Sequence, residues 1–163
     1  MSGTARVWRA QPDDVDDVVR LLLAFRDWLG SSSPAAHELE ASVSRLLTDP
    51  ATEFLLGAPG EERAAGVCQL RFRHSAWTSA DDCWLEDLFV EEQARGRGVG
   101  RALVSAACDR ARERGAGRIE LDTNERNTSA IALYESLGFS TMSKAHDEPA
   151  ELRGRDVFMG RRL

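Results

Sequence analysis

The chain has 163 residues, of which 42% are hydrophobic and 29% are charged, and its formal net charge is -6 at pH 7. This length and composition are typical of one globular domain, residues 1–163, with a sizeable core. The negative charge argues against a nucleic-acid-binding protein and is compatible with a cationic substrate. No apolar run reaches the ~20 residues of a membrane span and no signal-peptide core follows Met1, so we expect no membrane association.

The cysteines and histidines predict neither disulfides nor a metal site. Cys68, Cys83 and Cys108 are odd in number and scattered, which indicates reduced thiols and a cytoplasmic location. The histidines lack zinc-type spacing with one another or with the cysteines, so we expect no metal.

The N-terminal half predicts a strand, two helices and a hairpin in that order. The expected elements are a strand at Thr4–Arg9, a helix between Pro12 and Gly30, a helix that contains Leu39–Leu47, and strands near Glu53–Leu56 and Ala64–Arg73, joined through Gly57–Gly60. Alternation of Cys68, Leu70 and Phe72 places one face of the second hairpin strand in the core.

The most informative segment is Arg95-Gly96-Arg97-Gly98-Val99-Gly100-Arg101, which follows a predicted strand at Trp84–Val90 and begins a predicted helix. Glycines allow a bound group to approach the backbone closely. The amides in the first turn of a helix have no intrahelical partner and favour an anion. The arginines add positive charge, so the segment predicts a binding site for a phosphorylated ligand.

Two common phosphate-binding motifs do not fit this segment. A P-loop requires a Lys-Ser or Lys-Thr pair after its glycines, and the segment has none. The dinucleotide fingerprint Gly-x-Gly-x-x-Gly fits better, because Asp122 ends the next predicted strand, where a ribose-binding acid belongs. However, Arg101 or Leu103 occupies its third glycine position, depending on which glycine begins the count.

The segment does match the pattern Arg/Gln-x-x-Gly-x-Gly/Ala through Arg95, Gly98 and Gly100, and it resembles the pyrophosphate loop of Gcn5-related N-acetyltransferases, the GNAT superfamily. Residues Asn127 to Phe139 resemble the family element Asn-x-x-Ala-x-x-Leu/Phe-Tyr-x-x-x-Gly-Phe, with every named position filled. The likeness runs from about Trp84 to Phe139, roughly a third of the chain.

The resemblance implies a single-domain α/β GNAT fold. Its sheet should be mixed and mainly antiparallel, with six or seven strands, and about four helices should flank it. After Phe139 we expect closing strands near Ser140–Ser143 and Asp156–Met159, with a polar loop over Lys144–Gly154. The resemblance also implies acetyl-CoA as the co-substrate.

Acetyl transfer to an amine needs a base for the amine proton, a donor for the oxyanion and a proton for the thiolate. Glu86 is the candidate base. Strand alternation places it with Trp84, Leu88 and Val90, where apolar neighbours should raise its pKa. The alternative is that Glu86 faces solvent or pairs with an arginine of the neighbouring strand. Asp87 is expected on the opposite face, although a β-bulge could exchange the two.

Tyr134 is the candidate general acid, because the resemblance places it at the cofactor sulfur; a purely core aromatic is the alternative. Asn127 resembles the asparagine that binds the pantetheine arm, and it could also cap its helix. The resemblance implies further cofactor contacts from two segments, the end of the strand and the glycine loop. These contacts are Leu88, Phe89, Val90, Arg95, Gly96, Arg97, Gly98, Val99, Gly100 and Arg101.

Acidic residues gather at Asp13–Asp17, Asp81–Asp87 and Asp147–Glu151, which favours a multiply cationic acceptor if these segments flank the cleft; solvated surface is the alternative. The strand at Trp84–Val90 looks like that of spermidine/spermine acetyltransferases, and aminoglycoside acetyltransferases are comparably similar. We therefore expect direct transfer of an acetyl group to the primary amine of a small polyamine-, aminoglycoside- or amino-acid-like molecule. The alternatives are a protein lysine or N-terminal acetyltransferase and a non-catalytic CoA-binding module. A homodimer is also considered.

Overall fold

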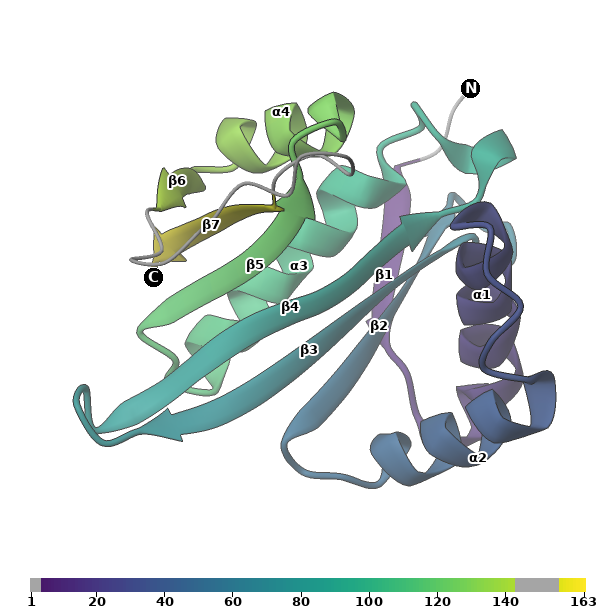
Figure 1. Cartoon of the computed structure of the whole chain (residues 1–163), viewed down its shortest axis with the longest axis horizontal. Helices are drawn as coiled ribbons and strands as arrows, with labels where there is room; N and C mark the ends of the chain where they lie inside the picture. The colour runs from purple at the N-terminus through teal and green to yellow at the C-terminus, as the bar shows by residue number, and fades with distance from the viewer. Residues whose placement is uncertain (1–3, 143–155) are drawn as a thin grey trace.

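A seven-stranded mixed sheet with four α-helices on its two faces is formed by residues 4–142 and 156–163, the residues that this computed structural model describes (Figure 1). The strands are β1 Ala5–Arg9, β2 Thr52–Pro59, β3 Gly66–Ser75, β4 Ala80–Val90, β5 Arg118–Asn124, β6 Ser140–Met142 and β7 Asp156–Arg162. The α-helices are α1 Val15–Trp28, α2 Ala36–Leu47, α3 Val99–Glu113 and α4 Thr128–Ser136. The strand order is β1-β2-β3-β4-β5-β7-β6.

Two hydrophobic cores lie on opposite faces of this sheet. Helices α1 and α2 cover one face, where Val18 and Leu21 pack with Val67 of β3. Helices α3 and α4 cover the other face, where Leu103 packs with Leu70 of β3. Successive strand residues point to opposite faces, so the buried strands β2 and β3 supply apolar side chains to both cores.

The predicted order of elements is confirmed, and several boundaries differ by up to four residues. Residues Gly57–Pro59 belong to β2 and pair with β1, whereas we expected them in the hairpin connection. Strand β4 begins at Ala80 rather than at Trp84. The expected loop over residues 144–154, with its acidic residues, lies outside the described residues.

Helix α3 approaches the sheet closely where two paired strands both have glycine. Gly57 of β2 lies opposite Gly66 of β3. A Cβ atom at Gly66 would lie 2.8 Å from Cγ1 of Val99 and 2.9 Å from Cδ1 of Leu103, and one at Gly57 would lie 3.0 Å from the same Val99 atom. These glycines therefore set how deeply the first turn of α3 sits against the sheet.

Candidate active site

Strands β4 and β5 separate toward their C-terminal ends (Figure 1). Their parallel pairing is confined to Asp82–Trp84 of β4 and Arg118–Glu120 of β5. Beyond this seam, Leu88–Val90 still pairs with β3, but its other edge has no strand partner among the described residues. Backbone N–H and C=O groups on such an edge can bind an extended ligand as a strand would. The predicted main-chain contacts Leu88, Phe89 and Val90 therefore line an open edge.

The glycine loop ends at the N-terminus of α3, as predicted. Gly96 has φ +73° and Gly98 has φ +84°, a left-handed conformation that side-chain-bearing residues rarely adopt. Gly98 is the N-cap residue of α3, and the amides of Val99, Gly100 and Arg101 follow in the first turn. These amides have no acceptor within the helix, so the loop can bind the phosphates of a nucleotide-like ligand.

The three arginines of the loop each contact another part of the protein. Arg95 donates from Nε to the carbonyl oxygen of Val90 at 3.0 Å, and its guanidinium lies 5.4 Å from the ring centre of Trp28. Arg97 pairs with Glu62 at 2.6 Å. Arg101 donates to Oγ of Ser136 in α4 at 3.0 Å. All three hydrogen bonds are exposed, and the contacts of Arg95 join the loop to β4 and α1.

A β-bulge in β4 changes the expected alternation around Glu86. Gln69 of β3 pairs with Asp87, but the next residue, Leu70, pairs with Leu85, which leaves Glu86 as the extra residue. The bulge shifts the face of every residue after it.

Our expectation that Glu86 shares a face with Leu88 and Val90 is therefore wrong. Leu88 packs against the core under α3, whereas Phe89 belongs to the core under α1. Glu86 lines a cavity with Trp84 on the α1 side of the sheet, and Asp87 faces the same side through its pairing with Gln69. The bulge thus brings two adjacent carboxylates to one face.

These two carboxylates differ in burial. Glu86 is exposed, so the expected enclosure by apolar neighbours is not observed. Asp87 is partly buried, and this burial, with a smaller contribution from the Glu86 charge, raises the pKa of Asp87 to about 6. A carboxylate with this pKa can exchange a proton close to neutral pH.

Tyr134 of α4 is buried in the core under α3, with its ring 5.7 Å from that of Phe139. Burial raises the pKa of its phenol well above the ordinary value, with a smaller contribution from the Cys68 thiol. The phenol therefore keeps its proton at neutral pH, and its O–H group can donate a hydrogen bond to a ligand. Tyr134 shares this core with Cys68 and with Leu88, which pair in register across β3 and β4.

Asn127 occupies the N-cap position of α4 and is exposed. Its backbone carbonyl accepts a hydrogen bond from Ile131 at 3.0 Å, but its side chain makes no capping hydrogen bond. The amide group is thus not committed to the helix, which leaves it available to a ligand, as the resemblance implies.

A cavity of 590 Å³ lies on the sheet face beside Glu86. Its lining residues come from β3, β4, β5 and β7 and are Arg71, Phe72, Arg73, Trp84, Glu86, Glu120, Asp122 and Phe158. The rings of Trp84 and Phe158 stack with centroids 6.1 Å apart. Neither Glu120 nor Phe158 was predicted from the sequence to be a site residue. Alternation of Glu120 and Asp122 with buried Ile119 and Leu121 was the available signal.

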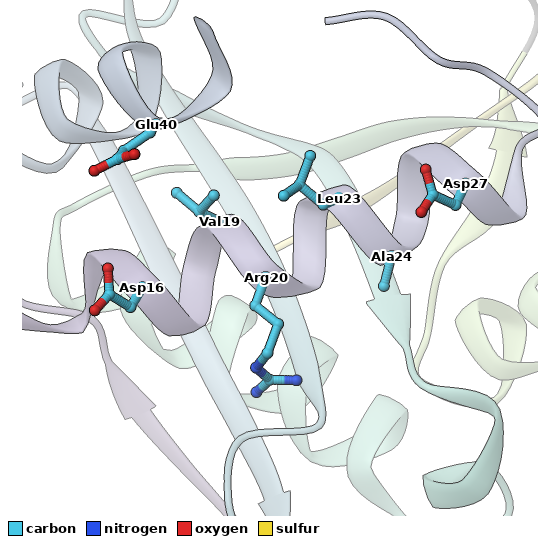
Figure 2. Close-up of a pocket in the computed structure, with 7 residues that line it drawn as sticks. All are labelled: Asp16, Val19, Arg20, Leu23, Ala24, Asp27 and Glu40. Carbon is cyan, nitrogen blue, oxygen red and sulfur yellow. The ribbon is translucent and has the colours of Figure 1, made fainter. Parts of the chain in front are cut away.

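A second hollow, of 420 Å³, lies along α1 and contains none of the predicted site residues (Figure 2). Figure 2 shows Arg20 extending from the middle of α1, with Glu40 contributed by α2. Arg20 pairs with Glu91 at 2.6 Å and donates to the carbonyl oxygen of Ala64 at 2.6 Å. We interpret this arginine as structural, since it joins α1 to the end of β4.

Within residues 4–142 and 156–163, no group of three or more His, Cys, Asp or Glu side chains is placed to bind a metal ion. Over the same residues, no helix is long and apolar enough to cross a membrane.

The profile of the acetyltransferase (GNAT) family matches residues 19–139. The thialysine N-epsilon-acetyltransferase of Mus musculus is 24% identical over 155 residues, which cover 88% of each chain. The streptothricin acetyltransferase of Streptomyces lavendulae is 36% identical over 120 residues, which cover 74% of this chain but only 57% of that protein.

Two solved structures have the same fold. The crystal structure of a probable acetyltransferase has a TM-score of 0.80 and 28% identity, and the match covers 90% of this chain and 98% of that one. An aminoglycoside N-acetyltransferase in complex with CoA has a TM-score of 0.75 and 17% identity, with 93% and 97% covered. The glycine loop and Tyr134 both lie within the residues that the family profile matches, and the chain belongs to the acetyltransferase (GNAT) family, whose members use acetyl-CoA.

Proposed function

We propose that this enzyme transfers an acetyl group from acetyl-CoA to the primary amine of a small acceptor with positive charge. The separation of β4 from β5, which leads to the N-terminus of α3, is the observation that supports this most strongly. The open edge of β4 can bind the extended part of a ligand, and the helix N-terminus that follows it can bind a phosphorylated end of the same ligand. The residues present therefore fit acetyl-CoA.

The proposed cofactor contacts follow from this arrangement. Backbone groups of Leu88–Val90 bind the pantetheine arm, with the Asn127 amide as a further partner. The amides of Gly98, Val99 and Gly100 bind the pyrophosphate, and Arg97 and Arg101 exchange their protein contacts for phosphate oxygens. When bound, acetyl-CoA supplies the activated acetyl thioester.

Glu86 is the proposed general base. Its carboxylate lies in the cavity beside the separated strands, where it can accept a proton from the ammonium form of the acceptor, directly or through water. Asp87 is the second candidate for this role, because its pKa of about 6 is closer to neutrality. A backbone N–H on the open edge of β4 stabilises the negative charge that develops on the carbonyl oxygen. Tyr134 donates its phenolic proton to the departing thiolate.

The acceptor is proposed to be a small molecule rather than a protein, because the aromatic and charged side chains surround a cavity of limited volume, 590 Å³. The names of the relatives point the same way, since thialysine and streptothricin are small amines. Cys68, Cys83 and Cys108 are buried free thiols, which supports a reducing compartment such as the cytoplasm.

Release of free thiol from acetyl-CoA tests this function directly. The acceptors should include polyamines, aminoglycosides, amino acids and lysine-containing peptides. We expect turnover with at least one small amine and stabilisation of the fold by acetyl-CoA. Turnover with peptides alone would identify a protein acetyltransferase, and binding of CoA without turnover of any amine would identify a non-catalytic module.

A further inference from the structure

Two arginines lie in the cavity beside its carboxylates, and the chemistry proposed above uses neither. Arg71 and Arg73 extend from β3, where they pair in register with Trp84 and Asp82 of β4. Both arginines are exposed, and neither forms an ion pair with another residue of the described part of the chain. Two neighbouring guanidinium groups at one end of a cavity are suited to a carboxylate, which each can bind through two parallel hydrogen bonds.

The rest of the cavity is suited to an amine with an apolar chain. Glu86, Glu120 and Asp122 provide negative charge from two strands. Glu120 is partly neutralised by Arg118 at 3.1 Å. The stacked rings of Trp84 and Phe158 provide an apolar surface in the same cavity.

We infer that the acetyl acceptor is a small amino-acid-like molecule, whose primary amine lies at Glu86 while its carboxylate binds Arg71 and Arg73. This inference rests on the proposed function and narrows its acceptor class. It also changes the expectation of a multiply cationic acceptor, because a polyamine would place positive charge beside two guanidinium groups that have no ion-pair partner among the described residues.

Lysine is a suitable probe of this acceptor class, because its side-chain amine and its carboxylate lie at opposite ends of an extended apolar chain. The test compares lysine with lysinamide, which has the same two amines but a neutral amide in place of the carboxylate. The values of kcat/KM for both are measured by thiol release at saturating acetyl-CoA. We expect lysine to be preferred by roughly 10-fold or more, since a charge-assisted hydrogen bond distinguishes the two acceptors. The same comparison for ornithine and ornithinamide tests an acceptor that is one methylene shorter.

Variants of Arg71 and Arg73 then test whether these two side chains cause the preference for lysine over lysinamide. Arg71→Gln and Arg73→Gln should each reduce the ratio of kcat/KM for lysine to kcat/KM for lysinamide. The reduction should come mainly from a higher KM for lysine, and kcat/KM for lysinamide should remain nearly unchanged. Arg71→Lys and Arg73→Lys retain positive charge and should retain part of the preference. Arg45→Gln, at an exposed position of α2 away from the cavity, is the matched control and should leave the ratio unchanged.

Three outcomes overturn the inference while leaving the acetyltransferase assignment intact. These are equal kcat/KM for lysine and lysinamide in the wild-type enzyme, a ratio unchanged in the Arg71→Gln/Arg73→Gln double variant, and faster turnover of polyamines or aminoglycosides than of any carboxylate-bearing amine. Absence of turnover with every amine overturns the proposed function and this inference together. Cooperative melting of each variant confirms that a lost preference does not reflect a lost fold.

Discussion

Arg97 and Glu62 form a two-bond ion pair that joins the glycine loop to the β2–β3 connection. Nη2 of Arg97 lies 2.6 Å from Oε1 of Glu62, and Nη1 lies 3.2 Å from Oε2. Each partner favours the charged form of the other, so the pKa of Glu62 is lowered and that of Arg97 is raised. The guanidinium proposed to bind phosphate is therefore occupied by a carboxylate of the same chain.

This pair predicts that Glu62→Gln strengthens cofactor binding. Removal of the competing carboxylate should lower the Kd for acetyl-CoA about threefold, because exposed ion pairs are weak. The melting temperature without ligand should change little. Glu61→Gln changes an exposed neighbour outside any ion pair of the described residues and should leave Kd unchanged. Weaker binding in Glu62→Gln would mean that Glu62 positions the loop instead of competing with phosphate.

Replacement of Glu86 by Gln should reduce kcat by ~10²-fold or more, because a positioned base is lost. The affinity for acetyl-CoA should remain nearly unchanged, since the carboxylate lies in the acceptor cavity. Steady-state kinetics and a separate binding titration distinguish the two effects. Wild-type rates in Glu86→Gln, together with a large loss in Asp87→Asn, would assign the base to Asp87.

The raised pKa of Asp87 makes a prediction about stability. The folded value is about 6 and the ordinary value is 3.8, so the folded state binds more protons between these pH values and stability falls as pH rises through them. The cost at pH 7 is on the order of 3 kcal/mol. Asp87→Asn should therefore raise the melting temperature at pH 7, and the gain should disappear near pH 4. A pH-independent effect would contradict this account.

Tyr134→Phe should lower turnover while the fold stays cooperative, because it removes the hydroxyl and keeps the buried ring. The deficit should shrink with an acetyl donor whose thiol is more acidic, since that thiolate leaves without a proton. Parallel measurements of kcat and of thermal melting test both statements. Early melting with normal activity per folded molecule would show that the hydroxyl is only structural.

Gly66→Ala should destabilise the fold by roughly 1–3 kcal/mol and weaken acetyl-CoA binding. The added Cβ would lie 2.8 Å from Val99 Cγ1, so the first turn of α3, which carries the amides proposed to bind phosphate, must shift. Gly117→Ala is the matched control, because nothing lies within 4 Å of a Cβ at that position. Equal behaviour of the two variants in melting and binding assays would show that the close approach of α3 has no effect.

The sequence predicted most of the fold because its signals are local. The glycine loop at Gly96–Gly100, the helix after it and the segment with Tyr134 each follow from neighbouring residues, and the structure places them as expected. The register of β3 against β4 is not local. The bulge at Glu86 depends on which residue of β3 pairs with Leu85, so strict alternation placed Leu88 and Val90 on the wrong face.

The cavity could not be predicted for a similar reason. Arg71, Trp84, Glu120 and Phe158 belong to four strands and become neighbours only through the order β3-β4-β5-β7. Each residue alone reads as an ordinary polar or aromatic strand position. Only the assembled sheet shows that their side chains share one face.

The short seam between β4 and β5 divides the sheet into a larger N-terminal part and the trio β5, β7 and β6. The two parts share few backbone hydrogen bonds across the seam, although one hydrophobic core extends under both. We expect the pantetheine arm that we propose to bind in the gap to join the two parts as an inserted strand would. Bound acetyl-CoA should then also hold the two parts of the sheet together. We therefore expect the enzyme to unfold most cooperatively when acetyl-CoA is bound.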